Sequence, residues 1–237
     1  MAVYPRMTGC DIIIGASGGI GSALAQHAAD GGAHVVPLAR SFSGEGHIDL
    51  EDEASIAAAA DLIRKQGLIP NRVIVATGLL HDGDNGPEKS LKDIDPEWMA
   101  RNYAVNTIGP ALIAKHFLPL MPRRQPAVFA AIGARVGSIS DNRLGGWYGY
   151  RAAKAALHMT ICNIAIEWGR RNEQAIAVAL HPGTVDTSLS KPFQANVAQS
   201  KLFDASYCAA RLLEVLAGLT PADSGQIFAW DGTRIQP

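Results

Sequence analysis

Short apolar runs of β type alternate with longer segments of helical pattern along almost the whole chain. Strand, helix and strand in repeated succession is typical of a parallel sheet with helices on both faces. One core of this kind suits the chain length of 237 residues. The sequence therefore predicts one α/β domain over 1–237, a doubly wound parallel sheet in three αβα layers. We expect strands near 10–15, 34–39, 72–76, 126–132, 175–181 and 226–230.

The helical segments carry recognisable start and stop signals. Acidic residues 51–53 favour a first helical turn, and Asp95 followed by Pro96 is typical of a capped start. Pro37 counts against a fully paired strand at 34–39. The long irregular stretch 184–201 is a candidate substrate lid. We expect helices over about 20–30, 51–65, 96–117 and 148–170.

Composition excludes several classes of partner. The chain has 22 Asp and Glu and 21 Lys and Arg, which gives a net charge of −1. This charge provides no positive electrostatic field that would attract nucleic acid or an acidic membrane. No apolar stretch approaches the roughly 20 residues of a membrane span. Cys10, Cys162 and Cys208 lie far apart, and no His, Asp or Glu cluster has metal-ligand spacing. We expect a cytoplasmic protein without a metal that acts on a small molecule.

A glycine-rich turn directly follows the first predicted strand. There, backbone N–H groups and a helix N-terminus face one point, and glycines let a diphosphate approach the main chain. The spacing is Gly-x-x-x-Gly-x-Gly rather than the commoner Gly-x-Gly-x-x-Gly. This context predicts a Rossmann-like dinucleotide site at Gly15, Ser17, Gly18, Gly19, Ile20 and Gly21.

The end of the second predicted strand holds Arg40, where an acidic residue normally reads the adenosine ribose. A guanidinium can pair with a 2′-phosphate in bidentate fashion, so Arg40 favours NADP(H) over NAD(H); the alternative is a solvated arginine at a strand end. Asp49 either caps a helix that starts at Leu50 or accepts a hydrogen bond from the adenine amine. Arg40, Asp49 and Leu50 are candidates for the adenine end of the cofactor site.

Tyr150 and Lys154 lie four residues apart, therefore side by side on one helix face. A phenol has an ordinary pKa of about 10, and an adjacent cation lowers it. The pair can then exchange a proton with a substrate oxygen. The alternative is a packed tyrosine beside a surface lysine. Trp147 and Tyr148 precede the pair and either wall a substrate pocket or serve ordinary packing.

Together these motifs resemble the short-chain dehydrogenase/reductase family, and they occur in the family's order over most of the chain. The last segment and the helix motif resemble the branch that contains the C-factor cell-signalling protein. The resemblance is carried by Gly15-Ala16-Ser17-Gly18-Gly19-Ile20-Gly21, Val105-Asn106-Thr107-Ile108-Gly109, Tyr150-Arg151-Ala152-Ala153-Lys154, His181-Pro182-Gly183-Thr184-Val185-Asp186-Thr187 and Phe228-Ala229-Trp230-Asp231-Gly232-Thr233.

The resemblance implies roles for these residues. Tyr150 would protonate or deprotonate the substrate oxygen, and Lys154 would lower the pKa of Tyr150 and hold the nicotinamide ribose. The resemblance also implies a homodimer or homotetramer, as in many relatives. It implies cofactor contacts at Thr77, Gly78, Pro182, Gly183, Val185 and Thr187.

Asn106 has a separate physical argument. Pro110, four residues later in the same predicted helix, has no N–H to give to the Asn106 carbonyl. In the family this asparagine binds a water that continues a proton relay, and a free carbonyl is what such a water needs. The alternative is a simple proline kink.

The chain departs from the family at a serine that normally follows the fifth strand. Gly133 or Ala134 stands where that hydroxyl belongs. Ser138, 12 residues before Tyr150, and Ser140 are the available substitutes, although a serine that caps a turn explains either equally well. The chain also departs from the family after the third strand, where Val75-Ala76-Thr77-Gly78 stands in place of an Asn-Asn-Ala-Gly type of sequence, and this change points to altered packing.

These patterns predict an NADPH-preferring oxidoreductase that moves a hydride between the nicotinamide and a carbonyl or alcohol substrate, with Tyr150 as acid or base. The alternative is a nucleotide-binding regulatory or cell-signalling protein of the same fold with weak or no catalysis. The missing serine and the branch resemblance favour that alternative.

Overall fold

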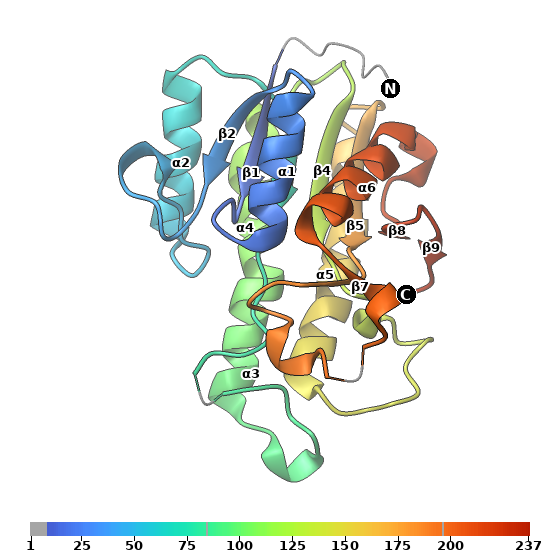
Figure 1. Cartoon of the computed structure of the whole chain (residues 1–237). Coiled ribbons are helices and arrows are strands. Elements are labelled where there is room, and N and C mark those ends of the chain that lie inside the picture. Colours follow the sequence, from blue (N-terminus) through green and yellow to red (C-terminus); the bar gives the residue numbers. More distant parts are fainter. Residues whose placement is uncertain (1–8, 84, 196) are drawn as a thin grey trace.

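The computed structural model describes residues 9–83, 85–195 and 197–237. Its centre is a seven-stranded sheet of order β2-β1-β3-β4-β5-β8-β9, in which every neighbouring pair is parallel except the final β8 and β9 (Figure 1). This confirms the predicted doubly wound parallel sheet. The strands are β1 Cys10–Ile14, β2 His34–Leu38, β3 Pro70–Val75, β4 Ala127–Ile132, β5 Ala175–His181, β8 Ile227–Ala229 and β9 Arg234–Ile235.

Pro37 lies inside β2, opposite Ile13 of β1. Because β2 is the edge strand of the sheet, the missing N–H of Pro37 deprives no second neighbour of a hydrogen bond. The sequence argument against a fully paired strand is thus compatible with a strand paired on one side.

Helices cover both faces of the sheet and complete the three αβα layers (Figure 1). Alternate residues of β1 divide between two cores: Ile12 and Ile14 face α2, α4 and α5, whereas Ile13 faces α1 and α6. Both faces of the sheet are therefore buried, as the continuous apolar runs predict. The helices are α1 Gly19–Asp30, α2 Glu53–Lys65, α3 Pro96–Tyr103, α4 Gly109–Phe117, α5 Tyr148–Gly169 and α6 Ala205–Gly218.

Aspartate side chains cap three helix starts. Asp52 accepts a hydrogen bond from the Ala54 N–H, Asp95 from Trp98 and Asp204 from Tyr207. The prediction that residues 51–53 form the first turn of α2 is therefore wrong by two residues, because the Asp52 carboxylate ends the extended backbone and starts the helix.

The predicted helix 96–117 is one helical run that contains a π-helical segment, Ala104–Ile108, between α3 and α4. Within it, the Gly109 N–H donates to the Ala104 carbonyl, five residues back. Pro110 cannot donate, so the wider turn accommodates a gap in the hydrogen-bond ladder. Asn106 lies in this widened segment rather than at a simple kink.

The segment 184–201 includes β6 Thr184–Val185, which pairs with β7 Leu202–Phe203. Residue 196 lies outside the described residues. None of the helices that the structure describes is both long enough and apolar enough to cross a membrane. Single 3₁₀ turns lie at Gly44–Gly46, Leu91–Asp93, Leu118–Leu120, Arg135–Gly137, Lys191–Phe193, Gln199–Lys201 and Pro221–Asp223.

Candidate functional site

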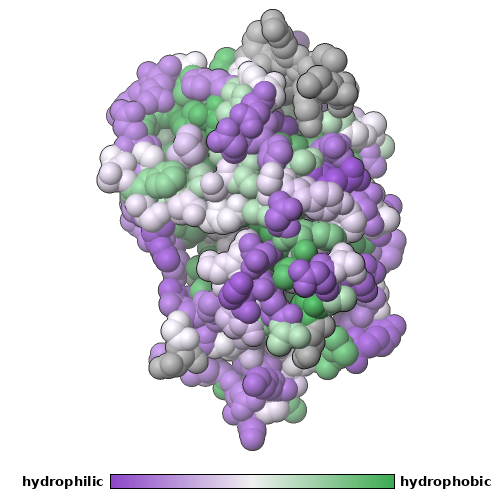
Figure 2. Space-filling view, viewed as in Figure 1, coloured by the Kyte–Doolittle hydropathy of each residue, from purple (hydrophilic) through white to green (hydrophobic). Residues whose placement is uncertain are grey.

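A groove of about 430 Å³ lies where the carboxyl ends of the central strands meet. In Figure 2 the surface is hollowed between the upper and the lower part of the molecule. Ligands of open parallel sheets bind at this edge. The groove brings together the following residues predicted from the sequence: Gly15, Ser17, Gly18, Gly19, Ile20, Arg40, Asp49, Leu50, Thr77, Gly78 and Thr187.

The glycine-rich turn fits the diphosphate of a dinucleotide. Gly15 has a φ of +84°, and a Cβ on Gly21 would collide with the Gly15 carbonyl, so the turn requires glycine at both positions. Unlike α2, α3 and α6, α1 starts at Gly18 without a hydrogen bond from a capping side chain. Its first N–H groups are thus left to satisfy an anion in the groove.

The adenosine end of the groove carries a chain of charges. Arg40 lies 3.4 Å from Glu51, and Glu51 lies 3.3 Å from Arg101, which also pairs with Asp82. The Arg40 side chain is 65% exposed. Its guanidinium is therefore held near the groove by one weak surface contact and can turn toward a ligand.

Asp49 lines the groove, but one of its two expected roles is wrong. Its carboxylate accepts a hydrogen bond from the Glu51 N–H at 3.0 Å, and the helix begins only at Glu53. Asp49 is thus part of a turn and not a helix N-cap, because the capping position belongs to Asp52. The adenine contact stays a prediction.

Tyr150 and Lys154 lie side by side on α5, and both are buried. The Lys154 ammonium lies 5.7 Å from the centre of the Tyr150 ring and donates to the Ile132 carbonyl at 2.8 Å. A Cβ on Gly78 would stand 4.0 Å from Lys154 Nζ and 3.6 Å from Asn106 Oδ1. Gly78 lines the groove, and the structure gathers Lys154, Asn106 and, through Lys154, Tyr150 beside it.

Asn106 fastens the loop after β3. Its Oδ1 accepts from the Leu79 N–H at 3.1 Å, and its Nδ2 donates to the Leu79 carbonyl at 2.8 Å. The side chain is only 1% exposed. Nδ2 also donates to Asn102 Oδ1 at 3.4 Å, so both N–H groups of the amide are used, and the Asn106 oxygen atoms are left to accept from the proposed water.

Burial dominates the protonation of the pair. It raises the pKa of Tyr150 well above its ordinary range and lowers the pKa of Lys154 to about 7. This direction for Tyr150 is opposite to the one expected from an adjacent cation. The physical reason is the burial of Tyr150 itself, which removes water from the phenolate form.

Ala134, rather than Gly133, occupies the side of Tyr150. Ala134 packs in a small apolar cluster with Tyr150, whereas a Cβ on Gly133 would point 3.0 Å from His158 Nε2. Ser138 is buried, and its hydroxyl accepts from the Asp141 N–H at 3.2 Å and lies 3.3 Å from the Ser140 hydroxyl. These contacts are those of a turn cap. Of the two candidates, Ala134 is thus the one beside Tyr150, and its correspondence to the family's serine stays a prediction.

Four of the predicted cofactor residues, Gly21, Pro182, Gly183 and Val185, do not line the groove. Gly21 packs against Gly15, and Val185 is 3% exposed in the core beside α6. The Pro182 carbonyl accepts from the Cys208 thiol at 3.4 Å. Gly183 has a φ of +76°, which turns the chain sharply after β5.

Sequence reasoning did not single out Phe193 or His158. Phe193 packs beside Trp147, with ring centres 5.2 Å apart, and this pairing joins segments 46 residues apart. His158 follows Lys154 by one helical turn, and its two ring nitrogens have no hydrogen-bond partner among the described residues. Burial, Lys154 and His181 lower the pKa of His158 to about 4. The four-residue spacing of Tyr150, Lys154 and His158 was the signal in the sequence that could have identified His158.

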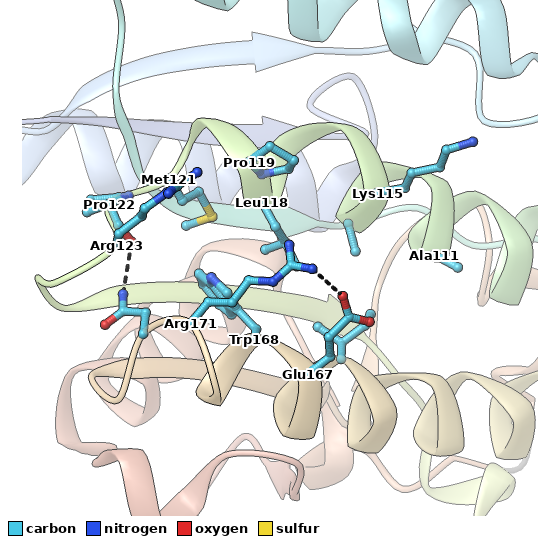
Figure 3. A pocket seen from close by; sticks show the side chains of 13 residues that line it. Ala111, Lys115, Leu118, Pro119, Met121, Pro122, Arg123, Glu167, Trp168 and Arg171 are labelled. Carbon is cyan, nitrogen blue, oxygen red and sulfur yellow. Dashed lines mark hydrogen bonds and ion pairs between the residues drawn. The ribbon is translucent and has the colours of Figure 1, made fainter.

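A second hollow of about 390 Å³ lies between the ends of α4 and α5, near Trp168 and Arg171 (Figure 3). None of the predicted site residues lines it, and two of its charged members, Arg171 and Glu167, pair with each other at 3.1 Å. Across residues 9–83, 85–195 and 197–237 no three His, Cys, Asp or Glu side chains are placed to hold a metal ion. The chemistry therefore concentrates at the groove.

Known proteins resemble this chain over 65% to 96% of its length. It is 27% identical to 1-hydroxy-2-glutathionyl-2-methyl-3-butene dehydrogenase of a Rhodococcus strain over 95% of this chain and 98% of that protein. It is 32% identical to C-signal of Myxococcus xanthus over 65% of this chain and 87% of C-signal. The NADPH-bound carbonyl reductase from chicken fatty liver superposes with a TM-score of 0.79 at 23% identity, over 96% of this chain and 98% of that one.

A family model described as short chain dehydrogenase matches residues 10–198. That range contains the glycine-rich turn, Asn106, Tyr150, Lys154 and the segment after β5. This chain therefore belongs to the short chain dehydrogenase family, whose members are oxidoreductases that bind a nicotinamide cofactor.

Proposed function

We propose that this protein is an NADPH-preferring reductase of a small carbonyl compound, or a dehydrogenase in the reverse direction, with Tyr150 as the acid or base. The observation that carries the proposal is the meeting of Tyr150, Lys154 and Asn106 beside Gly78 of the glycine-lined groove. The bound cofactor supplies the hydride.

Tyr150 holds the proton for a substrate oxygen. Because burial keeps its pKa high, Tyr150 is a neutral phenol at neutral pH and carries the proton that a substrate oxygen would accept. In the reverse direction the same oxygen accepts a proton from the alcohol. Ala134, which packs beside Tyr150, has no hydroxyl. Of these two residues, only Tyr150 can therefore orient the substrate oxygen.

Lys154 supplies charge beneath Tyr150. Its lowered pKa of about 7 means that the lysine gains or loses a proton near neutral pH, and it can therefore replace the proton that Tyr150 gives away. Asn106 holds the Leu79 backbone beside it and keeps this end of the groove in shape.

We expect Arg40→Ala to raise the KM for NADPH by about 10- to 100-fold, because a charge-assisted hydrogen bond to the 2′-phosphate is lost. The KM for NADH should stay within about twofold. Steady-state kinetics with both cofactors measures the two values.

Two variants serve as controls for this expectation. Arg64→Ala removes a comparably exposed arginine on α2, outside the groove, and should change neither KM. Glu51→Gln removes the carboxylate that competes for Arg40 and should lower the KM for NADPH. Equal changes for both cofactors in Arg40→Ala would contradict the assigned role.

Ala134→Ser should raise kcat for an aldehyde by about tenfold, because it adds a second hydrogen-bond donor beside Tyr150 for the developing oxyanion. Gly133→Ser is the matched variant. Its side chain would meet His158 and Ala179, at 3.0 and 3.3 Å, so it should lower stability without raising kcat. If Ser138→Ala instead abolished turnover, Ser138 would be the serine of this site.

The proposal as a whole is tested with a panel of aldehydes, ketones and alcohols, each assayed with NADPH and NADH. Turnover of a carbonyl with NADPH, lost in Tyr150→Phe, is the expected result. Absence of turnover with either cofactor over the whole panel would overturn the enzymatic proposal.

The second candidate function is a nucleotide-binding regulatory or signalling protein. The alanine at position 134, together with the similarity to C-signal, favours it. It requires tight NADPH binding without turnover. Fluorescence titration with NADPH, combined with the turnover assays on aldehydes, ketones and alcohols, distinguishes the enzyme from the binding protein.

We also propose that the segment 184–201 closes over the substrate and that the protein is a cytoplasmic homodimer or homotetramer. Ile108, Met159 and Ile166, on the helical run from α3 to α4 and on α5, are each at least half exposed and could be covered by a second copy. Light scattering at several concentrations gives the oligomeric state.

A further inference from the structure

An apolar cluster surrounds Tyr150, and one of its members, Leu189, also lines the groove. The Tyr150 hydroxyl and the Trp147 indole N–H are its polar groups, and its other members are Leu80, Ala134, Val136, Leu189 and Phe193. They come from the loops after β3, β4 and β5 and from the start of α5. An apolar wall with few polar groups matches a pocket that orients a substrate through those groups.

Phe193 is the member that the irregular segment contributes. Its ring lies between two others, with centres 5.2 Å from Trp147 and 5.9 Å from His81. It comes from the 3₁₀ turn Lys191–Phe193, which is tied to the loop after β3 by a contact between His81 Nε2 and the Ser188 carbonyl at 3.2 Å. Trp147 in turn contacts Tyr150, with ring centres 6.2 Å apart. The Phe193 ring is therefore connected to the Tyr150 ring through one intervening aromatic ring, that of Trp147.

Trp147 is held in an unfavourable backbone conformation. Its φ of 54° is the only positive φ of a non-glycine residue among those described, and such a conformation costs about 1 to 2 kcal/mol. The Glu88 carbonyl accepts its N–H, and the Glu88 carboxylate accepts from Gly149 at 3.1 Å. The fold thus maintains a strained residue whose side chain reaches Tyr150 and Phe193.

We propose that Trp147 and Phe193 determine specificity, and that the substrate is an uncharged carbonyl compound with a flat apolar body that stacks against Trp147. This inference rests on the proposed function, since Tyr150 must face the carbonyl oxygen. Charged and small polar carbonyl compounds fit poorly, because burying a carboxylate or hydroxyl among the apolar side chains of this cluster costs free energy.

The test compares aldehydes that share a ring and a carbonyl. With NADPH, kcat/KM for benzaldehyde should exceed that for 4-carboxybenzaldehyde and for glyceraldehyde by about 100-fold. Trp147→Ala should reduce the preference over 4-carboxybenzaldehyde to about tenfold or less. Phe193→Ala should favour 2-naphthaldehyde over benzaldehyde, because it opens space. Tyr148→Ala removes the neighbouring ring, which is not part of the cluster, and should leave the preference unchanged.

The outcomes separate this inference from the proposed function. Turnover of 4-carboxybenzaldehyde or glyceraldehyde as fast as benzaldehyde would overturn the inference and leave the reductase intact. If no aldehyde reacts, calorimetry on the NADPH-loaded protein decides: benzamide should bind more tightly than benzoate, and Trp147→Ala should abolish the difference. Equal binding of the two, or a difference that survives in Trp147→Ala, would refute the inference without reference to catalysis.

Discussion

Tyr150→Phe should lower kcat/KM for a carbonyl substrate by about 1,000-fold, because it removes the one hydroxyl that can give the substrate oxygen a proton. The substitution leaves the ring in its apolar cluster, where it contacts Trp147 with centres 6.2 Å apart. Folding and NADPH affinity should therefore be unchanged. Steady-state kinetics, thermal unfolding and fluorescence titration with NADPH measure the three quantities.

The neighbouring tyrosine provides the control. Tyr148→Phe removes a hydroxyl two residues away that is outside the cluster, and it should retain full activity. Near-normal turnover in Tyr150→Phe would show that another group protonates the substrate. A loss of NADPH binding in the same variant would show that the hydroxyl serves the cofactor rather than the proton transfer.

The fold follows closely from local sequence signals. Each predicted strand and helix exists, since both faces of the sheet are buried and the apolar runs are continuous. Errors arise where hydrogen bonds decide the local geometry. The Asp52 side chain caps α2, which therefore starts at Glu53 rather than at Glu51, and a π-helical segment precedes Pro110, which has no N–H to donate.

The candidate site was predictable in part, because the glycine-rich turn and the pair Tyr150 and Lys154 are local patterns. What the sequence could not reveal depends on contacts between distant segments. The pairing of Trp147 with Phe193 is one example, and the choice of Ala134 over Gly133 is another. The pKa of Tyr150 also escapes local reasoning, since burial by remote segments outweighs the adjacent ammonium.

Lys154→Met should lower kcat/KM by about 100-fold or more, because the proton reserve and the charge beneath Tyr150 are lost. The same variant should change how stability depends on pH. Folding lowers the pKa of Lys154 from 10.5 to about 7, so above pH 7 the unfolded chain binds more protons at this site than the folded one. Stability of the wild-type protein should therefore rise with pH, by up to about 1.4 kcal/mol per pH unit from this lysine, and the variant should lack that contribution.

The window for this measurement is about pH 7 to 8.5, because other buried groups act outside it. His158 and His181, with pKa values lowered to about 4, add a rise that ends near their ordinary value of 6.5. The buried thiols Cys10 and Cys208, with pKa values raised to about 11 and about 12, lower stability once the unfolded thiols ionise near 9.0. Denaturant midpoints of wild type and Lys154→Met across the window isolate the lysine. Parallel curves for the two proteins would mean that Lys154 stays charged when buried, and its role as a proton reserve near neutral pH would then be wrong even if activity were lost.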